Sequence, residues 1–276
     1  MEKRNANGLT EAEFLAQYRP GDYKRPSVTV DMMVLRMKQG LDGLQLLLIQ
    51  RKDHPFMGHW ALPGGFINMD ESAYEAACRE LQEETSLTDV YLEQIYTMSQ
   101  PERDPRMRVI DIAYMALLPY GTVAEAVAGD DAQNACWFDM ELTDKELKLM
   151  QTGQNIEICY ELEKQSFRNG RITVENYVPR RAKGCDDALA FDHAQIILEG
   201  FLRLRNKVMY TDVAFNLVPE EFTLPDLQKV FEQILGKELY KANFREKVEG
   251  KVEALERKAR PITSSRKSML YRYKMK

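Results

Sequence analysis

The sequence has few cysteines, no long apolar run and no internal repeat. Its four cysteines, Cys78, Cys136, Cys159 and Cys185, are scattered among 276 residues with no C-x-x-C pair. A disulfide framework or a zinc site would cluster them, so we expect reduced thiols in a cytoplasmic protein. No apolar run reaches the roughly 18 residues that span a bilayer, and the first residues contain no apolar signal core. The sequence therefore predicts no membrane partner.

Charge is distributed unevenly along the chain. The formal net charge of −5 argues mildly against nucleic acid as a partner. Residues 237–276, however, contain thirteen Lys or Arg and five Asp or Glu, a net of +8, which leaves −13 on the rest of the chain. This asymmetry suggests separate partners for the two parts, although a solvated basic C-terminus would give the same count. At about 100–200 residues per domain, the length predicts two domains.

The apolar patterns predict an α+β fold followed by a small helical domain. We expect strands over residues 27–37, 44–50, 90–99, 108–118 and 134–138, and helices over residues 71–85, 144–150 and 192–207. Asn169-Gly170 predicts a hairpin turn between strand-like runs at 156–162 and 171–178. The expected domains are residues 1–187, with a β-hairpin insertion at about 150–180 of unassigned role, and residues 188–276.

The helix expected at 71–85 has a strongly acidic face. Glu80 shares this face with Glu83 and Glu84 because they follow it by three and four residues. Like charges at this spacing destabilise a helix, so we expect a hard divalent cation, Mg²⁺ or Mn²⁺, to bind there. Arg79 precedes Glu83 by four residues and is placed to orient its carboxylate. Gly65 belongs to a Gly-Gly turn whose backbone carbonyl can approach the same metal.

This spacing resembles the Nudix box, G-x5-E-x7-R-E-U-x-E-E-x-G-U, where U is a bulky aliphatic residue. One position departs, because Ser86 occupies the place of the second glycine. That glycine would cap the helix in the left-handed conformation, so we expect its loss to affect local stability more than chemistry. The matching residues are Gly65, Glu71, Arg79, Glu80, Leu81, Glu83, Glu84 and Leu87.

The resemblance implies a Nudix fold, a mixed sheet in an α/β/α sandwich, and metal-dependent hydrolysis of a nucleoside diphosphate linked to another group. Carried over from the family, the metal ligands are Glu80, Glu83, Glu84 and the carbonyl of Gly65. Glu83, Glu84 and Arg79 are the expected catalytic residues. Whether the base is one of these glutamates or one on a later loop stays open.

A run of arginines and prolines downstream bears on the substrate. Pro101 follows Ser86 by fifteen residues, which resembles the ADP-ribose pyrophosphatase branch of the family. Arg103 and Arg106 in the same run, with Arg51 at the end of a strand, are expected to bind phosphates. A surface turn would contain the same residue types. ADP-ribose, cleaved to AMP and ribose 5-phosphate, is the first choice, and other nucleotide diphosphates remain open.

Three further residues near these motifs are expected to be structural. Trp60 and Phe66 could stack on an adenine, but we expect both to pack in the core. His193 lies near the domain junction, where a buried structural role is favoured over a chemical one.

The C-terminal region has the pattern of a winged helix-turn-helix. Thr223 is placed to cap a helix that ends near residue 235, and a basic helix over 241–248 follows. Residues 252–260 and 269–273 then flank a basic loop, which is typical of a wing. A packing or dimerisation module would show the same elements. The residues expected to contact double-stranded DNA are Lys241, Asn243, Arg245, Lys247, Arg266 and Lys267.

The stretch from residues 189–193 (LAFDH) through Asn216-Leu217 to Tyr271-Arg272 resembles the C-terminal half of Nudix-related transcriptional regulators of NAD metabolism, in which ADP-ribose is the effector. The resemblance covers most of the chain except the insertion at 150–187. Two functions therefore remain: a Nudix hydrolase acting on ADP-ribose, and an ADP-ribose-sensing DNA-binding regulator with little or no hydrolysis. The hydrolase is favoured because every glutamate of the box is present. A homodimer is expected, because operator binding and the active sites of this branch commonly use two subunits.

Overall fold

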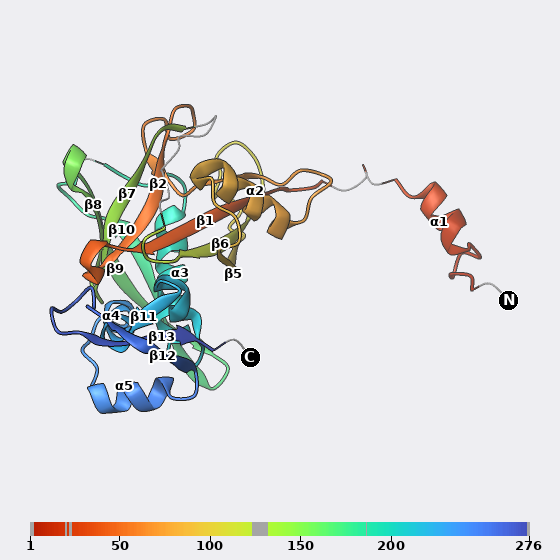
Figure 1. The fold of residues 1–276 in the computed structure, drawn as a ribbon. Coiled ribbons are helices and arrows are strands. Elements are labelled where there is room, and N and C mark those ends of the chain that lie inside the picture. Colours follow the sequence, from red (N-terminus) through yellow and green to blue (C-terminus); the bar gives the residue numbers. More distant parts are fainter. Residues whose placement is uncertain (1–2, 20, 22–23, 123–131, 186, 275–276) are drawn as a thin grey trace.

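The computed structural model describes residues 3–19, 21, 24–122, 132–185 and 187–274. Figure 1 shows a body made of a large sheet with helices beside it, a smaller domain below, and an N-terminal helix, α1 (Glu11–Gln17), standing away from both. Thr10 caps α1 through a reciprocal contact with Glu13. Among the described residues, no helix is long and apolar enough to cross a membrane.

A ten-stranded mixed sheet forms the body, with the order β10-β9-β8-β7-β2-β1-β6-β5 and with β3 and β4 paired to β2 and β1. The central pair β1–β6 is parallel, and the other pairs are antiparallel. The strands are β1 (Ser27–Met37), β2 (Leu44–Arg51), β3 (Trp60–Ala61), β4 (Gly64–Phe66), β5 (Tyr91–Met98), β6 (Val109–Leu118), β7 (Ala132–Leu142), β8 (Glu146–Gln151), β9 (Ile156–Asn169) and β10 (Ile172–Arg181).

The two faces of this sheet are covered by different helices. On β1, Met32 and Val34 pack with α2 (Ala73–Thr85), whereas Met33 and Leu35 belong to the cluster that contains α3 (His193–Lys207). Successive strand residues point to opposite faces, so α2 and α3 lie on opposite sides of the sheet. This arrangement is the mixed-sheet sandwich that the sequence predicted.

The smaller domain contains three helical segments and a three-stranded sheet of order β11-β13-β12. Its elements are the 3₁₀ turn η4 (Val213–Leu217), β11 (Glu221–Thr223), α4 (Leu224–Leu235), α5 (Lys241–Val248), β12 (Val252–Ala259) and β13 (Ser268–Tyr273). Thr223 accepts a hydrogen bond from the backbone of Asp226 and caps α4, as expected. Two consecutive helices followed by a hairpin are the predicted winged helix-turn-helix.

The helix expected at 144–150 is wrong, because residues 146–151 form strand β8. Leu147 and Leu149 are fully buried, while Glu146 is exposed. This alternation has the period of two that suits a strand with one covered face. β8 also pairs with β9, so the predicted hairpin of β9 and β10 extends the main sheet rather than standing apart from it.

The expectation of four reduced cysteines is also wrong. Cys159 on β9 forms a disulfide with Cys185, which lies 26 residues later in the loop before α3. The loop returns to β9 because the backbone N–H of Ala182 donates to the carbonyl of Cys159 at 3.0 Å. Spacing along the chain gave no indication of this return. Cys78 and Cys136 are free thiols.

Candidate functional site

Helix α2 begins and ends with well-defined caps. Ser72 accepts a hydrogen bond from the backbone of Glu75, whose side chain accepts from the backbone of Ser72 in return. At the other end, Ser86 has φ 57° and ψ 19°, and its backbone N–H donates to the carbonyl of Gln82 at 2.8 Å. The backbone therefore adopts the left-handed cap for which the Nudix box carries glycine.

Strand β4 brings the backbone of Gly65 against the carboxylate of Glu80. A Cβ atom at Gly65 would overlap the Oε1 atom of Glu80, so any larger residue here would displace this buried carboxylate. Glu80 is only 8% exposed, and this burial raises the pKa of its carboxyl group although Arg79 acts in the opposite direction. A bound cation would stabilise the ionised carboxylate that burial disfavours.

Arg79 lies at the centre of the acidic face. Its guanidinium donates to both carboxylate oxygens of Glu71 at 2.7 and 3.1 Å and to Glu80 at 2.8 Å, and it lies 3.5 Å from Glu83. The hydrogen bond from Arg79 is the largest of the effects that lower the pKa of Glu71 from 4.5 to about 2. Arg79 thus offsets the repulsion between the glutamates, for which the sequence had predicted a metal ion.

The expected metal ligands occupy different environments. Glu80 and Glu84 are buried, whereas the Glu83 side chain is 56% exposed. Among the residues that the structure describes, one group of three acidic or cysteine side chains has all its candidate ligand atoms within 4.8 Å, namely Glu157, Cys159 and Cys185, and its two sulfur atoms are bound to each other in the disulfide. The glutamates of the box are not gathered to that distance. Their all-oxygen donor set, with the carbonyl of Gly65, still suits a hard divalent cation.

The three arginines expected to bind phosphate line one small pocket beside Gly65. Arg51, Arg103 and Arg106 surround a cavity of about 100 Å³ that also borders on Gly64 and Gly65. Arg106 pairs with Asp104 through two hydrogen bonds of 2.8 and 3.1 Å, which fixes its guanidinium. Residues from three separate segments therefore bring three guanidinium groups, together with the carboxylates of Asp31 and Asp104, around one pocket.

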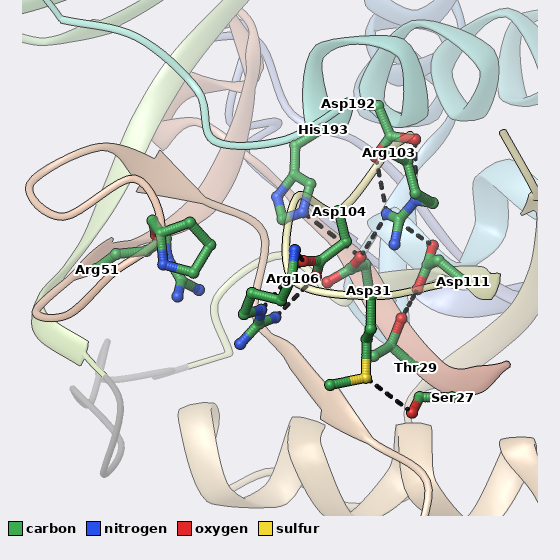
Figure 2. A network of polar contacts seen from close by, with 12 residues as sticks. Ser27, Thr29, Asp31, Arg51, Arg103, Asp104, Arg106, Asp111, Asp192 and His193 are labelled. Atoms are coloured by element: carbon green, nitrogen blue, oxygen red, sulfur yellow. Dashed lines mark hydrogen bonds and ion pairs between the residues drawn. The ribbon is translucent and has the colours of Figure 1, made fainter. Parts of the chain in front are cut away.

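Behind this pocket lies a buried polar network that the sequence motifs do not predict (Figure 2). Arg103, whose side chain is 4% exposed, donates to both carboxylate oxygens of Asp192 at 2.7 and 3.0 Å. Its Nη2 also lies 3.4 Å from Asp31 and 4.0 Å from Asp111. His193 accepts a hydrogen bond from the backbone of Leu62 at Nδ1, which places its proton on Nε2, 3.5 Å from Asp31. His193 is thus a buried bridging residue.

The two aspartates of this network have pKa values shifted in opposite directions. Burial raises the pKa of Asp111 well above its ordinary value, and the neighbouring Asp31 charge adds to this effect. Burial opposes ionisation of Asp31 as well, but His193, Arg103 and a hydrogen bond from Asp111 lower its pKa. Of the two carboxyl groups, Asp111 therefore holds a proton more strongly than Asp31. Each aspartate is the single acidic residue of a largely apolar strand. This pattern is the sequence signal that could have identified them as buried polar residues.

Aromatic rings complete the pocket. Trp60 is buried, as expected, but Phe66 is 45% exposed and lines the pocket, so the prediction that it packs in the core is wrong. Phe191, from the segment before α3, also lines the pocket, with the guanidinium of Arg51 5.1 Å from its ring centre. Arg106 lies within 6 Å of both phenylalanine rings, at 5.8 and 5.9 Å. Phe191 has φ 49°, which is unusual for a bulky residue and typical of functional sites.

Four of the six residues expected to contact DNA line a second cavity in the smaller domain. The groove lies between α4, α5 and the loop from β12 to β13, and has a volume of about 720 Å³. Asn243 is exposed on α5 but does not line it. The ammonium group of Lys247 donates to the backbone carbonyl of Met209, and this side chain does not line the groove. The residues that line the groove are Lys241, Arg245, Arg266 and Lys267.

A buried aspartate holds the loop of the wing beside this groove. Asp226, 3% exposed on the first turn of α4, accepts hydrogen bonds from the backbone N–H and the hydroxyl of Thr263, both at 3.2 Å. Its other oxygen accepts from Thr223 at 2.7 Å. The basic loop is therefore fixed relative to the start of α4.

Comparison with known proteins identifies both parts of the chain. Residues 25–156 match the model of the NUDIX domain, and residues 214–273 match the model of the NrtR DNA-binding winged helix domain. The chain is 32% identical over 271 residues to the ADPR responsive transcriptional repressor NtrR of Acinetobacter baylyi, which covers 97% of this chain and 90% of the relative.

Two further proteins resemble the chain in structure or in part. The crystal structure of Shewanella oneidensis NrtR complexed with a 27mer DNA is 28% identical, with a TM-score of 0.60 over 90% of this chain and 93% of that one. An ADP-ribose pyrophosphatase of Methanocaldococcus jannaschii is 38% identical over 138 residues, 50% of this chain and 75% of the relative.

Proposed function

Because the chain belongs to the family of Nudix proteins with a C-terminal NrtR-type winged helix domain, we propose that it is a DNA-binding transcriptional regulator that responds to ADP-ribose. The observation that carries this proposal is the continuity of the two sites. The segment that completes the arginine-lined pocket, through Phe191 and His193, is also the segment that begins α3 and leads into the winged helix.

The pocket suits the diphosphate of ADP-ribose. Arginine guanidinium groups bind phosphate oxygens through pairs of hydrogen bonds and keep their charge at any ordinary pH. Arg51, Arg103 and Arg106 supply three such groups, and the half-exposed ring of Phe66 offers a surface for a base. A homodimer is part of the proposal, since a two-fold symmetric regulator matches a palindromic operator.

The groove of the winged helix suits the DNA backbone and major groove. Lys241 and Arg245 project from α5, the second helix of the helix-turn-helix, and Arg266 and Lys267 come from the wing. Each phosphate contact releases condensed counterions, so DNA affinity falls as salt concentration rises.

The test of this function is DNA binding with and without ADP-ribose, using a duplex selected by the protein from random sequences. Replacing both Lys241 and Arg245 by Ala should weaken binding and reduce the slope of log K against log[salt] by about two. The matched control replaces Lys251 and Arg272, which pair with Asp212, Glu220 and Glu221 outside the groove, and should leave the slope unchanged. Selection of no duplex, or an affinity that ADP-ribose leaves unchanged, would reject the regulator.

A second candidate function, hydrolysis of ADP-ribose, is favoured by the intact set of glutamates. Divalent metals are general in Nudix hydrolases, and here Glu80, Glu83, Glu84 and the carbonyl of Gly65 would hold Mg²⁺ or Mn²⁺. The ion would neutralise diphosphate charge and lower the pKa of a bound water. Arg79 orients Glu80 and Glu83 for that role.

Hydrolysis is tested by release of AMP and ribose 5-phosphate from ADP-ribose in the presence of Mg²⁺ or Mn²⁺. Replacing Glu83 or Glu84 by Gln should abolish turnover. Glu75→Gln, on the same helix, is the control, because glutamine preserves the capping contact with Ser72. Absence of turnover by the unaltered protein would leave binding as the only role of the Nudix domain.

A further inference from the structure

The segment from Ala188 to His193 connects the pocket to the winged helix domain. The backbone N–H of Trp60 donates to the carbonyl of Ala188 at 3.0 Å, and that of Ala190 donates to the carbonyl of Trp60 at 2.7 Å. His193 then accepts from the backbone of Leu62. This segment is therefore held along β3, next to the glycines of β4, before it enters α3.

At the end of this segment, Asp192 occupies the N-cap position of α3 but makes no side-chain capping bond. N-cap aspartates normally accept a hydrogen bond from the first turn of their own helix. Here the carboxylate is bound instead to Arg103 on the loop between β5 and β6, through both of its oxygens. The ion pair thus joins the ligand pocket to the first turn of α3.

Arg103 faces space for a ligand on two sides. On one side is the 100 Å³ pocket beside Gly65, which accommodates a diphosphate but no nucleoside, since pockets for larger ligands have about 300–1,000 Å³. On the other side, Arg103 and Asp192 together line a groove of about 720 Å³ between β5, β10 and α3. A nucleoside diphosphate whose phosphate groups enter the pocket therefore meets this ion pair.

We propose that the ion pair between Arg103 and Asp192 couples ligand binding to DNA binding. Phosphate oxygens compete with Asp192 for the guanidinium of Arg103, and the loss of that pair frees the first turn of α3 to shift. This inference rests on the proposed function, in which the ligand is ADP-ribose, and it names the residues through which the response passes.

Helix α3 is suited to carry such a shift to the DNA-binding domain. Its fifteen residues span about 22 Å. At its far end Phe201 and Leu204 are buried in the cluster that includes Val230 and Phe231 of α4, and Arg205 donates to the carbonyl of Ile234 at 3.3 Å. A displacement at Asp192 therefore moves a rigid element packed directly on the helix-turn-helix.

The test compares Asp192→Asn with a control that breaks a similar link away from the pocket. Glu93 on β5 pairs with Lys207 of α3 at 2.6 Å, and its side chain is 19% exposed against 20% for Asp192. Each variant removes one carboxylate that ties α3 to the large sheet or its loops. The two positions differ in that Asp192 contacts an arginine of the pocket, whereas Glu93 contacts lysine and arginine side chains of α3. Glu93→Gln is the matched control.

Two quantities are measured for each protein: the ratio of DNA dissociation constants with and without ADP-ribose, and the affinity for ADP-ribose alone. Allosteric ratios are typically about 5–150-fold. For Asp192→Asn, the ratio should fall below about twofold. ADP-ribose should also bind more tightly, because its phosphates no longer have to break an ion pair between Arg103 and Asp192. Glu93→Gln should keep the ratio and the affinity of the unaltered protein.

The outcomes separate this inference from the function on which it rests. If the unaltered protein shows no response to ADP-ribose, the proposed function fails. If it responds and Asp192→Asn responds equally, or binds ADP-ribose more weakly, the coupling role is overturned. Hydrogen exchange tests the coupling on the unaltered protein. The backbone amides of residues 193–197 should exchange faster when ADP-ribose is bound, and unchanged exchange also overturns the proposal.

Discussion

Replacing Ser86 by glycine should stabilise the protein. Ser86 adopts φ 57°, where an L-residue is disfavoured by about 1–2 kcal/mol. Glycine removes that cost but brings a larger loss of backbone entropy on folding, about 0.5–1 kcal/mol. Because Ser86 is exposed, the lost hydroxymethyl group removes little packing. The expected gain is therefore about 0.5–1 kcal/mol in the free energy of unfolding.

Urea unfolding followed by tryptophan fluorescence measures this change, because Trp60 is buried in the sheet core. The matched control is Asn155→Gly. Asn155 also caps a short helix with positive φ, 53°, and is exposed. Asparagine tolerates this conformation, so the control should change stability by less than about 0.5 kcal/mol. Equal effects at both positions, or destabilisation by Ser86→Gly, would contradict the assignment of strain to the serine cap.

Three further outcomes are expected. Glu71, whose pKa falls from 4.5 to about 2 beside Arg79, contributes stability above pH 4.5 that disappears as pH falls through 2; Glu71→Gln should flatten unfolding free energy across that interval. Asp226→Ala should cost about 1–3 kcal/mol in stability by unpairing Thr263, and should weaken DNA binding by releasing the wing, as measured by unfolding and DNA titration. Titration with a thiol reagent under denaturing, non-reducing conditions should count two thiols rather than four, because Cys185 is in a disulfide.

The fold was predictable where periodicity and local motifs agree. The acidic helix α2 and the helix-turn-helix lie where the sequence places them, because their apolar stripes and capping residues are local signals. Strand β8 was missed because six residues are too few to distinguish the periodicity of a strand from that of a helix. Its pairing with β9 buries Leu147 and Leu149, which is a tertiary contact that the local sequence does not specify. The disulfide was missed because it depends on a loop that returns to a strand.

The candidate site was predictable in its charges but not in its connections. Arg51, Arg103 and Arg106 carry the charge that phosphate recognition requires, and the structure gathers all three at one pocket. The engagement of Arg103 by Asp192 could not be foreseen, since the two residues are 89 positions apart. Tertiary structure alone determines that Arg103 faces both the ligand and the helix that leads to the DNA-binding domain.

The intact glutamates do not by themselves distinguish an enzyme from a sensor, because some of them also hold the structure together. Glu71 and Glu80 bind Arg79 at 2.7 and 2.8 Å, and this arginine also donates to the carbonyl of Phe66, so the three side chains fasten β4 to α2. A regulator without hydrolysis would still need them to form its ligand pocket. Glu83 is different, since it is exposed and lies 3.5 Å from Arg79. Its retention is explained better by metal binding than by folding, so turnover lost in Glu83→Gln without loss of stability is the result that would specifically support hydrolysis.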